Sequence, residues 1–283
     1  MTEPKFTIQP MTRGQLDIAI DWAAQEGWNP GKFDGDCYFK ADPKGFFMGF
    51  LGDTPIASIS LVKYNGNFAF IGFYIVAPPF RGKGYGLKLW THAIDPVKGF
   101  NVALDGVTDQ QDNYKKSGFK LAFANIRFQG KGGGPMPDTP GIVPLKTIPR
   151  DQFLTYDRPF FPGNRAEFIS SWITQPCSTA LGFVQGNELK GYGVIRECRQ
   201  GHKIGPLFAD TPDQARTLFQ ALKSKVADGD SIFLDIPKTN PHALELVNSH
   251  NMVPVFETAR MYTGPFPELP MEKIFGITSF EVG

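Results

Sequence analysis

The sequence predicts an α/β protein built from two similar halves, each a mixed β-sheet with helices on both faces. Short apolar runs rich in β-branched and aromatic residues alternate with segments whose apolar residues recur at helical spacing. Residues 130–141, a stretch of glycine, proline and other turn formers, interrupt this alternation near the middle of the 283-residue chain. We therefore expect two domains, residues 1–129 and 142–283, joined by a Gly/Pro-rich linker over 130–141.

The first half is expected to alternate strands with helices around one irregular segment. Residues 27–44 carry glycine, proline and aspartate without a clear period, so we expect them to be irregular. The expected order of the other elements is strand 6–9, helix 13–26, strands 45–51, 55–64 and 67–76, helix 85–95, strand 101–107, short helix 109–117 and strand 119–128.

The second half repeats this order of elements. Ala215, Leu218, Phe219, Leu222 and Val226 recur at helical spacing, which predicts a helix over 212–227. The expected order is strand 142–145, helix 165–173, strands 178–185, 189–197 and 203–208, helix 212–227, strand 231–236, helix 240–249 and strand 253–262.

A glycine-rich loop over residues 81–86 joins the strand at 67–76 to the helix at 85–95. Pro78 and Pro79 end the strand. Glycines let backbone N–H groups approach a ligand, and the first helical turn adds unpaired donors and the positive end of the helix dipole. The segment predicts a phosphate-binding loop, with a ligand-free turn as the alternative. Its members are Arg81, Gly82, Lys83, Gly84, Tyr85 and Gly86.

The spacing within this loop excludes two familiar phosphate-binding patterns. A Walker A loop follows Gly-Lys with Ser or Thr, whereas Lys83 is followed by Gly84, and the dinucleotide fingerprint does not alternate its glycines strictly. The pattern that fits is Arg-x-x-Gly-x-Gly, which resembles the acyl-CoA pyrophosphate loop of the GNAT superfamily of N-acetyltransferases. The resemblance implies that acetyl-CoA is the co-substrate, bound by the loop and by the strand residues before it, Tyr74, Ile75 and Val76.

A second motif lies about 30 residues downstream, a distance that fits one βαβ unit. Tyr114 stands four residues before Gly118-Phe119, and this spacing resembles the Tyr-x-x-x-Gly-Phe signature of the same superfamily. The resemblance implies that the Tyr114 hydroxyl is the general acid for the departing thiolate. A phenol with a pKa of about 10 stays protonated at neutral pH, which suits that role. An aromatic side chain that only packs on the sheet is the alternative.

The second half resembles the same family without these key residues. After the strand at 203–208 the chain has neither the arginine nor the alternating glycines, and Asn251-Met252 stand where Gly-Phe is expected. The resemblance therefore implies two tandem GNAT-like domains, each a mostly antiparallel twisted sheet with helices on both faces. We expect the first to bind acetyl-CoA and the second, degenerate one to contribute to the acceptor site.

The segment after the first helix supplies candidate acceptor-binding residues, because in the GNAT fold this region lies over the acceptor site. A carboxylate, such as that of Glu26 or Asp34, can attract an amine, and the face of Trp28 can stack on it. Solvated loop turns are the alternative for the two acids. In the second half, Arg158 and Arg165 either bind an anionic group of the acceptor or tie the domains together.

Composition limits the function class. The formal net charge is +1, from 29 Lys+Arg against 28 Asp+Glu, which favours neither a nucleic acid nor an anionic membrane as a partner. Three cysteines and four histidines show no metal-ligand or redox spacing, so we expect no metal site and a reducing, cytoplasmic location. The first residues lack a hydrophobic segment and no apolar run approaches the length of a membrane span, so neither a signal peptide nor a membrane anchor is expected.

Together these features predict an acyl-CoA-dependent N-acyltransferase that moves an acetyl group from acetyl-CoA to a primary amine. Attack is expected to be direct, with Tyr114 as the general acid, because no cysteine lies in the motifs. The balanced charge leans toward a small-molecule amine, with peptide or protein amines as the competing class. The protein is expected to be a monomer or a homodimer. A CoA-binding sensor without catalysis and a protein–protein adaptor are the alternatives from other classes.

Overall fold

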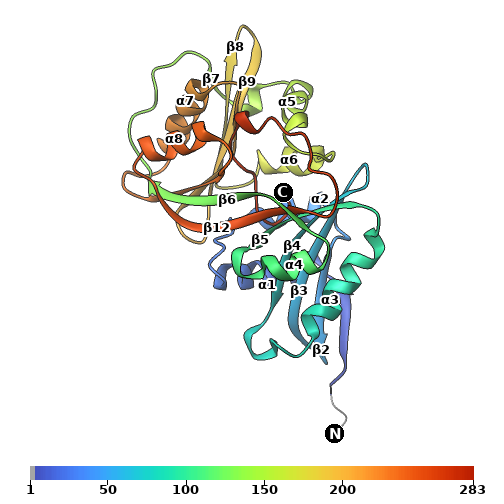
Figure 1. The fold of residues 1–283 in the computed structure, drawn as a ribbon. Helices are drawn as coiled ribbons and strands as arrows, with labels where there is room; N and C mark the ends of the chain where they lie inside the picture. The colour runs from blue at the N-terminus through green and yellow to red at the C-terminus, as the bar shows by residue number, and fades with distance from the viewer. Residues whose placement is uncertain (1–3) are drawn as a thin grey trace.

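The computed structural model describes residues 4–283. Within these residues, thirteen strands join in one continuous sheet that runs through both halves, with helices packed along it (Figure 1). Neighbouring strands are antiparallel except at two places, where β4 pairs with β5 and β10 pairs with β11. This confirms the predicted mixed, mostly antiparallel α/β fold. Among the described residues, no helix combines the length and the apolar character needed to cross a bilayer.

The first half follows the predicted order with one addition. The segment expected to be irregular contains α2, an eight-residue helix that packs on α1 and on α6 of the second half. A helix this short depends on tertiary packing, so its local sequence carries little signal. The elements are β1 (Phe6–Pro10), α1 (Arg13–Gln25), α2 (Asp34–Ala41), β2 (Phe46–Leu51), β3 (Thr54–Tyr64), β4 (Phe68–Val76), α3 (Tyr85–Ile94), β5 (Asn101–Val107), α4 (Gln111–Lys116) and β6 (Lys120–Lys131).

The second half also follows its predicted order and adds two short elements, α5 and β13, that the sequence analysis did not predict. Both are too short to show a periodic pattern of their own. The elements are β7 (Ile142–Pro144), α5 (Arg150–Asp157), α6 (Ala166–Trp172), β8 (Ser178–Gln185), β9 (Glu188–Glu197), β10 (His202–Ala209), α7 (Pro212–Lys223), β11 (Ser231–Pro237), α8 (Pro241–Ser249), β12 (Val253–Tyr262) and β13 (Ile274–Gly276).

The two halves exchange a strand. β12 lies between β5 and β6, so a strand from the second half completes the sheet of the first. β6 in turn pairs with β11 and extends the sheet of the second half. Figure 1 shows β6 and β12 side by side where the halves meet. The division into residues 1–129, 130–141 and 142–283 stays a prediction, and the hydrogen-bonded sheet is continuous across it.

Aromatic side chains fill the core between the halves. Tyr38 of α2 contacts Phe168 and Trp172 of α6, with ring centres 6.4 and 5.8 Å apart. The guanidinium of Arg196 in β9 lies 4.3 Å from the centre of the Trp172 ring. Such aromatic and cation–π contacts add to the burial of apolar surface. The halves therefore share one packed core where they meet.

Each half contains a gap between its two parallel strands, and only the second is filled by the chain itself. β10 pairs with β11 from His202 to Ile204 and then separates from it. β13 occupies this gap, since it pairs with β10 and the Ile277 N–H that follows it donates to the carbonyl of Asp235 in β11 at 2.9 Å. The segment beyond β13 is buried and reaches the first half, where Tyr64 Oη donates to the carbonyl of Val282 at 2.8 Å.

Candidate active site

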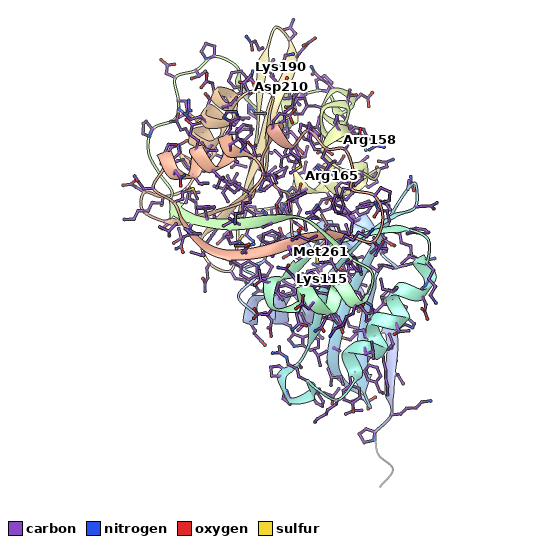
Figure 2. The ribbon with its side chains drawn as sticks, in the orientation of Figure 1. Lys115, Arg158, Arg165, Lys190, Asp210 and Met261 are labelled. Carbon is purple, nitrogen blue, oxygen red and sulfur yellow. The ribbon has the colours of Figure 1, made fainter. Side chains whose placement is uncertain are left out.

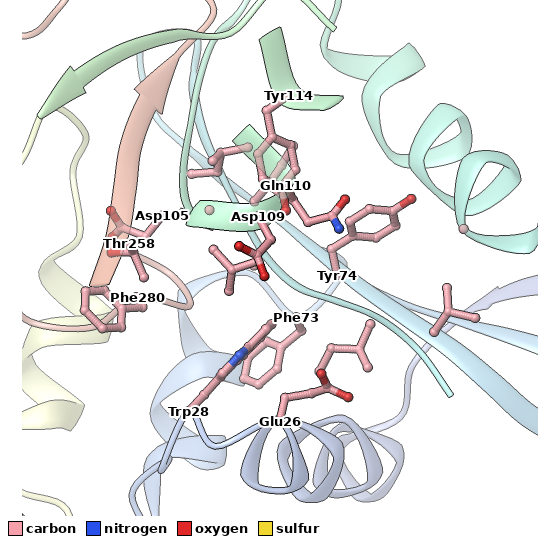
Figure 3. A pocket seen from close by; sticks show the side chains of 18 of the residues that line it. Glu26, Trp28, Phe73, Tyr74, Asp105, Asp109, Gln110, Tyr114, Thr258 and Phe280 are labelled. Atoms are coloured by element: carbon pink, nitrogen blue, oxygen red, sulfur yellow. The ribbon is translucent and has the colours of Figure 1, made fainter. Parts of the chain in front are cut away.

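A cavity of about 760 Å³ opens where β4 and β5 of the first half separate (Figure 3). The two strands pair only as far as Ile71 and Leu104. β4 then forms a bulge in which Phe73 has a φ of 48° and the Ser58 hydroxyl donates to its carbonyl at 2.7 Å. A bulge bends its strand and interrupts the hydrogen-bond ladder. Backbone groups of β4 beyond Ile71 are therefore free of β5 and face the gap.

The glycine-rich loop forms the mouth of this cavity. Gly82 and Gly84 have φ values of 75° and 79°, a left-handed conformation that favours glycine, and Gly84 is the N-cap of α3. A Cβ atom on Gly86 would lie 2.8 Å from the Tyr74 hydroxyl, so glycine is needed there for space. The loop thus presents backbone and the start of α3 to the cavity, where the helix dipole favours an anion.

Arg81 holds the loop in place, and Lys83 lies outside the cavity lining. Arg81 Nε donates to the carbonyl of Val76 at 2.8 Å, and its guanidinium forms an ion pair with Glu26. Lys83 Nζ donates to the carbonyl of Pro79 at 3.0 Å. The arginine therefore links the end of β4 to the end of α1, while the lysine stabilises its own turn.

Tyr114 lines the cavity from the α4 side (Figure 3). Its ring lies over Gly106 of β5 and contacts Trp90, with ring centres 5.7 Å apart. Burial, with a smaller contribution from Tyr74, raises the pKa of Tyr114 to about 12. A group with this pKa keeps its proton at neutral pH and can donate it inside the cavity.

Most of the residues predicted from the sequence meet at this one cavity. They come from the end of α1, the bulged strand, the loop and α4. The members that line it are Glu26, Trp28, Tyr74, Ile75, Val76, Arg81, Gly82, Gly84, Tyr85, Gly86 and Tyr114.

Asp34, the third residue predicted to bind the acceptor, lies outside the lining of this cavity. Its carboxylate is fully buried beside α2. One oxygen accepts from Arg196 Nε at 2.8 Å, and the other accepts from the Gly31 N–H at 2.8 Å and the Tyr38 hydroxyl at 3.1 Å. A buried carboxylate needs such partners, so Asp34 joins α2 to β9 of the second half.

Comparisons with known proteins identify the family of both halves. A model of the acetyltransferase (GNAT) family matches residues 16–119, and an acetyltransferase (GNAT) domain model matches residues 153–276. Holothin acyltransferase from a Pseudoalteromonas species is 30% identical over 278 residues, which cover 98% of this chain and 95% of that protein. The chain belongs to the GNAT acetyltransferase family. Both halves are GNAT domains, and the protein is an acyl-CoA-dependent N-acyltransferase.

Solved structures show the same fold at lower identity. A putative acetyltransferase from Pyrococcus horikoshii superposes with a TM-score of 0.83 at 22% identity, covering 98% of this chain and 96% of that one. A tandem GNAT protein from the clavulanic acid biosynthesis pathway gives a TM-score of 0.64 at 12% identity, covering 93% and 100% of the two chains. The fold of these structures agrees with the two family-model matches, which confirm the tandem arrangement of GNAT domains.

The second GNAT domain differs from the first where acyl-CoA would enter. Ala209, Asp210 and Thr211 precede α7, where the first domain has its arginine and glycines. The gap between β10 and β11 is filled by β13. Both differences fit the predicted degenerate character of the second domain.

Part of the GNAT cavity wall was not predicted from the sequence. Arg260 of β12 binds the buried carboxylate of Asp105 in two contacts, Nε to Oδ1 at 2.8 Å and Nη2 to Oδ2 at 2.6 Å. Burial raises the pKa of Asp105, and Arg260 opposes the rise. The wall also includes Phe256 and Thr258 of β12 and Phe280 of the final segment. No local motif marks Phe256, Thr258 or Phe280, because the first two reach the cavity through the exchanged strand β12 and the third through the final segment.

Arg158 and Arg165, the two candidate arginines of the second half, do not belong to the cavity lining. Figure 2 labels both of them in the second half. Arg165 forms two hydrogen bonds with Asp157, at 3.0 and 2.7 Å, and donates to the Thr278 hydroxyl at 2.9 Å. Arg158 donates to the carbonyl of Phe161 at 3.2 Å. All of these partners belong to the second half, so the contacts support a structural role within that half and show neither an anion site nor a link between the domains.

Proposed function

We propose that this GNAT protein transfers an acetyl group from acetyl-CoA to a primary amine of a small molecule at a single active centre. The observation that carries the proposal is the convergence of the glycine-rich loop, the bulged end of β4 and the Tyr114 side chain on one cavity. These three parts supply what acyl transfer requires: a site for the pyrophosphate, groups that polarise the thioester, and a proton donor for the leaving thiolate.

The loop fits the pyrophosphate of acetyl-CoA. A Cβ atom added at Gly82 or Gly84 would meet no protein atom within 4 Å, so the space beside these residues is open. Backbone N–H groups of the loop and of the first turn of α3 would hold the phosphates, and Arg81 would add positive charge. Tyr74, Ile75 and Val76 would pair through their backbone with the pantetheine arm along the free edge of β4.

The reaction proceeds by direct attack. The acceptor nitrogen forms a bond to the thioester carbonyl carbon, and backbone N–H groups of β4 beyond the bulge stabilise the charge on the carbonyl oxygen. The carbon–sulfur bond then breaks, and the Tyr114 hydroxyl gives its proton to the thiolate. The proton lost by the nitrogen returns through solvent to Tyr114. The products are the acetylated amine and free CoA.

Two observations favour a small acceptor. The cavity volume, about 760 Å³, lies within the range of small-molecule sites, and its lining comes from both domains. The GNAT relative that matches along nearly the whole chain is named for acylation of holothin. We infer that this protein likewise acts on a discrete small molecule and place it in the cytoplasm as a monomer or homodimer.

The proposal is tested by calorimetry and by a thiol-release assay with a panel of amines. The native protein is expected to bind acetyl-CoA, and Gly84→Glu is expected to abolish binding by placing a carboxylate at the phosphate site. An acceptor in the panel should release free CoA in proportion to acetylated product. Failure of the native protein to bind acetyl-CoA would overturn the proposal, and binding without transfer to any amine would favour the sensor alternative.

A further inference from the structure

A strained residue stands at the point where β4 leaves β5. Phe73 has a φ of 48°, in the left-handed region that a bulky aromatic residue rarely adopts. It lies in the β4 bulge, just beyond Ile71, the last residue of β4 that pairs with β5. Figure 3 shows Phe73 and Tyr74, the next residue in the chain, at the wall of the cavity. Backbone strain of this kind persists only where neighbouring groups hold it, so the contacts of Phe73 set the geometry of the bulge.

One of these contacts comes from the side chain of Ser58 in β3. Its hydroxyl donates to the carbonyl of Phe73 at 2.7 Å, and the whole residue is buried. In the sheet, β3 is the neighbour of β4 on the side opposite β5. The hydrogen bond therefore turns the Phe73 carbonyl toward β3 and away from the gap between β4 and β5.

The direction of this carbonyl determines the direction of the N–H that follows it. The peptide between Phe73 and Tyr74 is trans, and in a planar trans peptide the C=O and N–H groups point in opposite directions. Since the carbonyl points at Ser58, the Tyr74 N–H points away from β3, to the side of β5. β5 does not pair with β4 beyond Ile71, so this N–H faces the gap in which the thioester is proposed to lie.

The final segment of the second domain packs against the same bulge. A Cβ atom on Gly72 would lie 2.0 Å from the carbonyl oxygen of Glu281, so the two backbones are in direct contact. Glu281 Oε2 lies 3.0 Å from the Tyr38 hydroxyl, and the ring centre of Tyr38 lies 5.7 Å from that of Phe73. Tyr38, Phe73 and Glu281 are all buried. Relaxation of the bulge would therefore require the final segment to move, which supports the orientation that Ser58 sets.

Resting on the proposed function, we propose that Ser58 is a positioning residue for acyl transfer: its hydroxyl fixes the Phe73–Tyr74 peptide so that the Tyr74 N–H donates to the thioester carbonyl oxygen. Ser58 touches neither substrate and acts only through this peptide. A donor that is aligned before the reaction stabilises the negative charge that develops on the oxygen without any reorganisation. Because Glu281 supports the same bulge, the second domain contributes to the geometry of the active centre in the first.

The first test identifies the donor in the native protein by NMR. Labelling with ¹⁵N-tyrosine marks the amides of the eight tyrosines, and the Tyr74 signal is the one that Tyr74→Phe removes. Acetyl-CoA carries the thioester carbonyl and free CoA does not, so the pair isolates the contact with that oxygen. We expect the Tyr74 amide proton to move downfield with acetyl-CoA relative to free CoA. The same position with both ligands would overturn the inference.

The second test compares Ser58→Ala with Ser60→Ala by isotope-edited infrared spectroscopy of bound [1-¹³C]acetyl-CoA. Ser60 is the matched control, because it lies on the same strand, is equally buried, and its hydroxyl has no hydrogen-bond partner among residues 4–283. A hydrogen bond to the thioester oxygen weakens the C=O bond, so the native protein should lower the stretching frequency below that of free acetyl-CoA. Ser58→Ala should return the frequency toward the free value, and Ser60→Ala should leave it at the native value.

This readout separates a positioning role from a structural one, because a loss of stability alone does not change the carbonyl of the bound ligand. With any panel amine that the native protein acetylates, Ser58→Ala should also lower kcat about tenfold to 100-fold, and Ser60→Ala should not. A native frequency and kcat in Ser58→Ala, or equal changes in the two serine variants, would contradict the inference. The NMR test on the native protein decides the matter if Ser58→Ala impairs folding.

The outcomes separate the inference from the proposed function. Failure of the native protein to bind acetyl-CoA, or a bound thioester with the frequency of the free one, contradicts the proposed function itself. Acetyl-CoA binding with a lowered frequency that Ser58→Ala leaves unchanged contradicts only the inference.

Discussion

The Tyr114 ring lies directly over Gly106, so closely that a Cβ atom on residue 106 would overlap it. Gly106 belongs to β5 and Tyr114 to α4, and the contact brings the phenol to the wall of the cavity between β4 and β5. A glycine in the middle of a strand is unfavourable unless close approach requires it. Here that approach positions the proposed general acid.

Removal of the Tyr114 hydroxyl should slow catalysis without weakening acetyl-CoA binding. Tyr114→Phe keeps the ring contacts with Trp90 but cannot donate a proton. We expect kcat to fall by about 100-fold or more, the usual contribution of general acid catalysis, with the Kd for acetyl-CoA unchanged. Thiol release and calorimetry measure the two effects, and Tyr156→Phe in the second domain is the control. An unchanged kcat would mean that Tyr114 is not the acid.

Gly106→Ala should displace the Tyr114 ring, because the added Cβ atom would overlap it. The displaced phenol would be badly positioned to donate its proton, so kcat should fall. Combined with Tyr114→Phe, Gly106→Ala should cause little further loss of kcat, because both changes remove one function and such effects are not additive. A double-mutant cycle on kcat measures this coupling. Additive losses would show that Gly106 acts independently of the Tyr114 hydroxyl.

The raised pKa of Tyr114 predicts a stability effect at high pH. Its folded-state pKa is about 12, against about 10 for an unfolded tyrosine. The resulting stability is fully present below pH 10 and is lost as the pH rises through 12, by about 2–3 kcal/mol. Urea unfolding at pH 9 and 11 should therefore show a smaller loss for Tyr114→Phe than for the native protein. An equal loss in the two proteins would contradict the buried, protonated phenol.

The left-handed backbone at Gly84 should be necessary for acetyl-CoA binding. Alanine at a φ of 79° costs about 1–2 kcal/mol in this conformation, so Gly84→Ala should weaken the Kd for acetyl-CoA about tenfold as the loop relaxes. Gly66→Ala is the matched control, because Gly66 has a φ of 87°, is equally open and lies outside the cavity lining. Gly66→Ala should lower the free energy of unfolding and leave the Kd for acetyl-CoA unchanged. Equal effects of the two substitutions on this Kd would refute a local role of Gly84.

Asp34 should matter for stability rather than for the acceptor. Asp34→Asn breaks a fully buried pair with Arg196, so we expect a loss of about 3–5 kcal/mol in the free energy of unfolding. Asp36→Asn provides the comparison: its ion pair with Arg13 is partly exposed and should contribute about 0–1 kcal/mol. Urea denaturation measures both. A higher KM for the amine with unchanged stability would restore Asp34 as an acceptor ligand.

The predictions from sequence succeeded where the determining residues lie close together in the chain. The glycine-rich loop needs glycine because Gly82 and Gly84 have positive φ values. Its alternating glycines can be recognised in the sequence without any structure. The order of strands and long helices was likewise readable from apolar spacing. The short helix α2 and the strand β13 were missed because packing against distant elements, not local propensity, stabilises them.

The sequence by itself determined the family and the tandem order of its two GNAT halves. It also singled out the glycine-rich loop and Tyr114, because their spacing lies within one βαβ unit. Only the tertiary structure decided which acidic residues are free, since the partner of Asp34 is Arg196 and that of Asp105 is Arg260. It also decided that Phe256 and Phe280 line the cavity. The physical reason is that these contacts join segments far apart in the chain. The exchanged strand β12, for example, pairs with β5 about 150 residues away, and no local pattern encodes such a pairing.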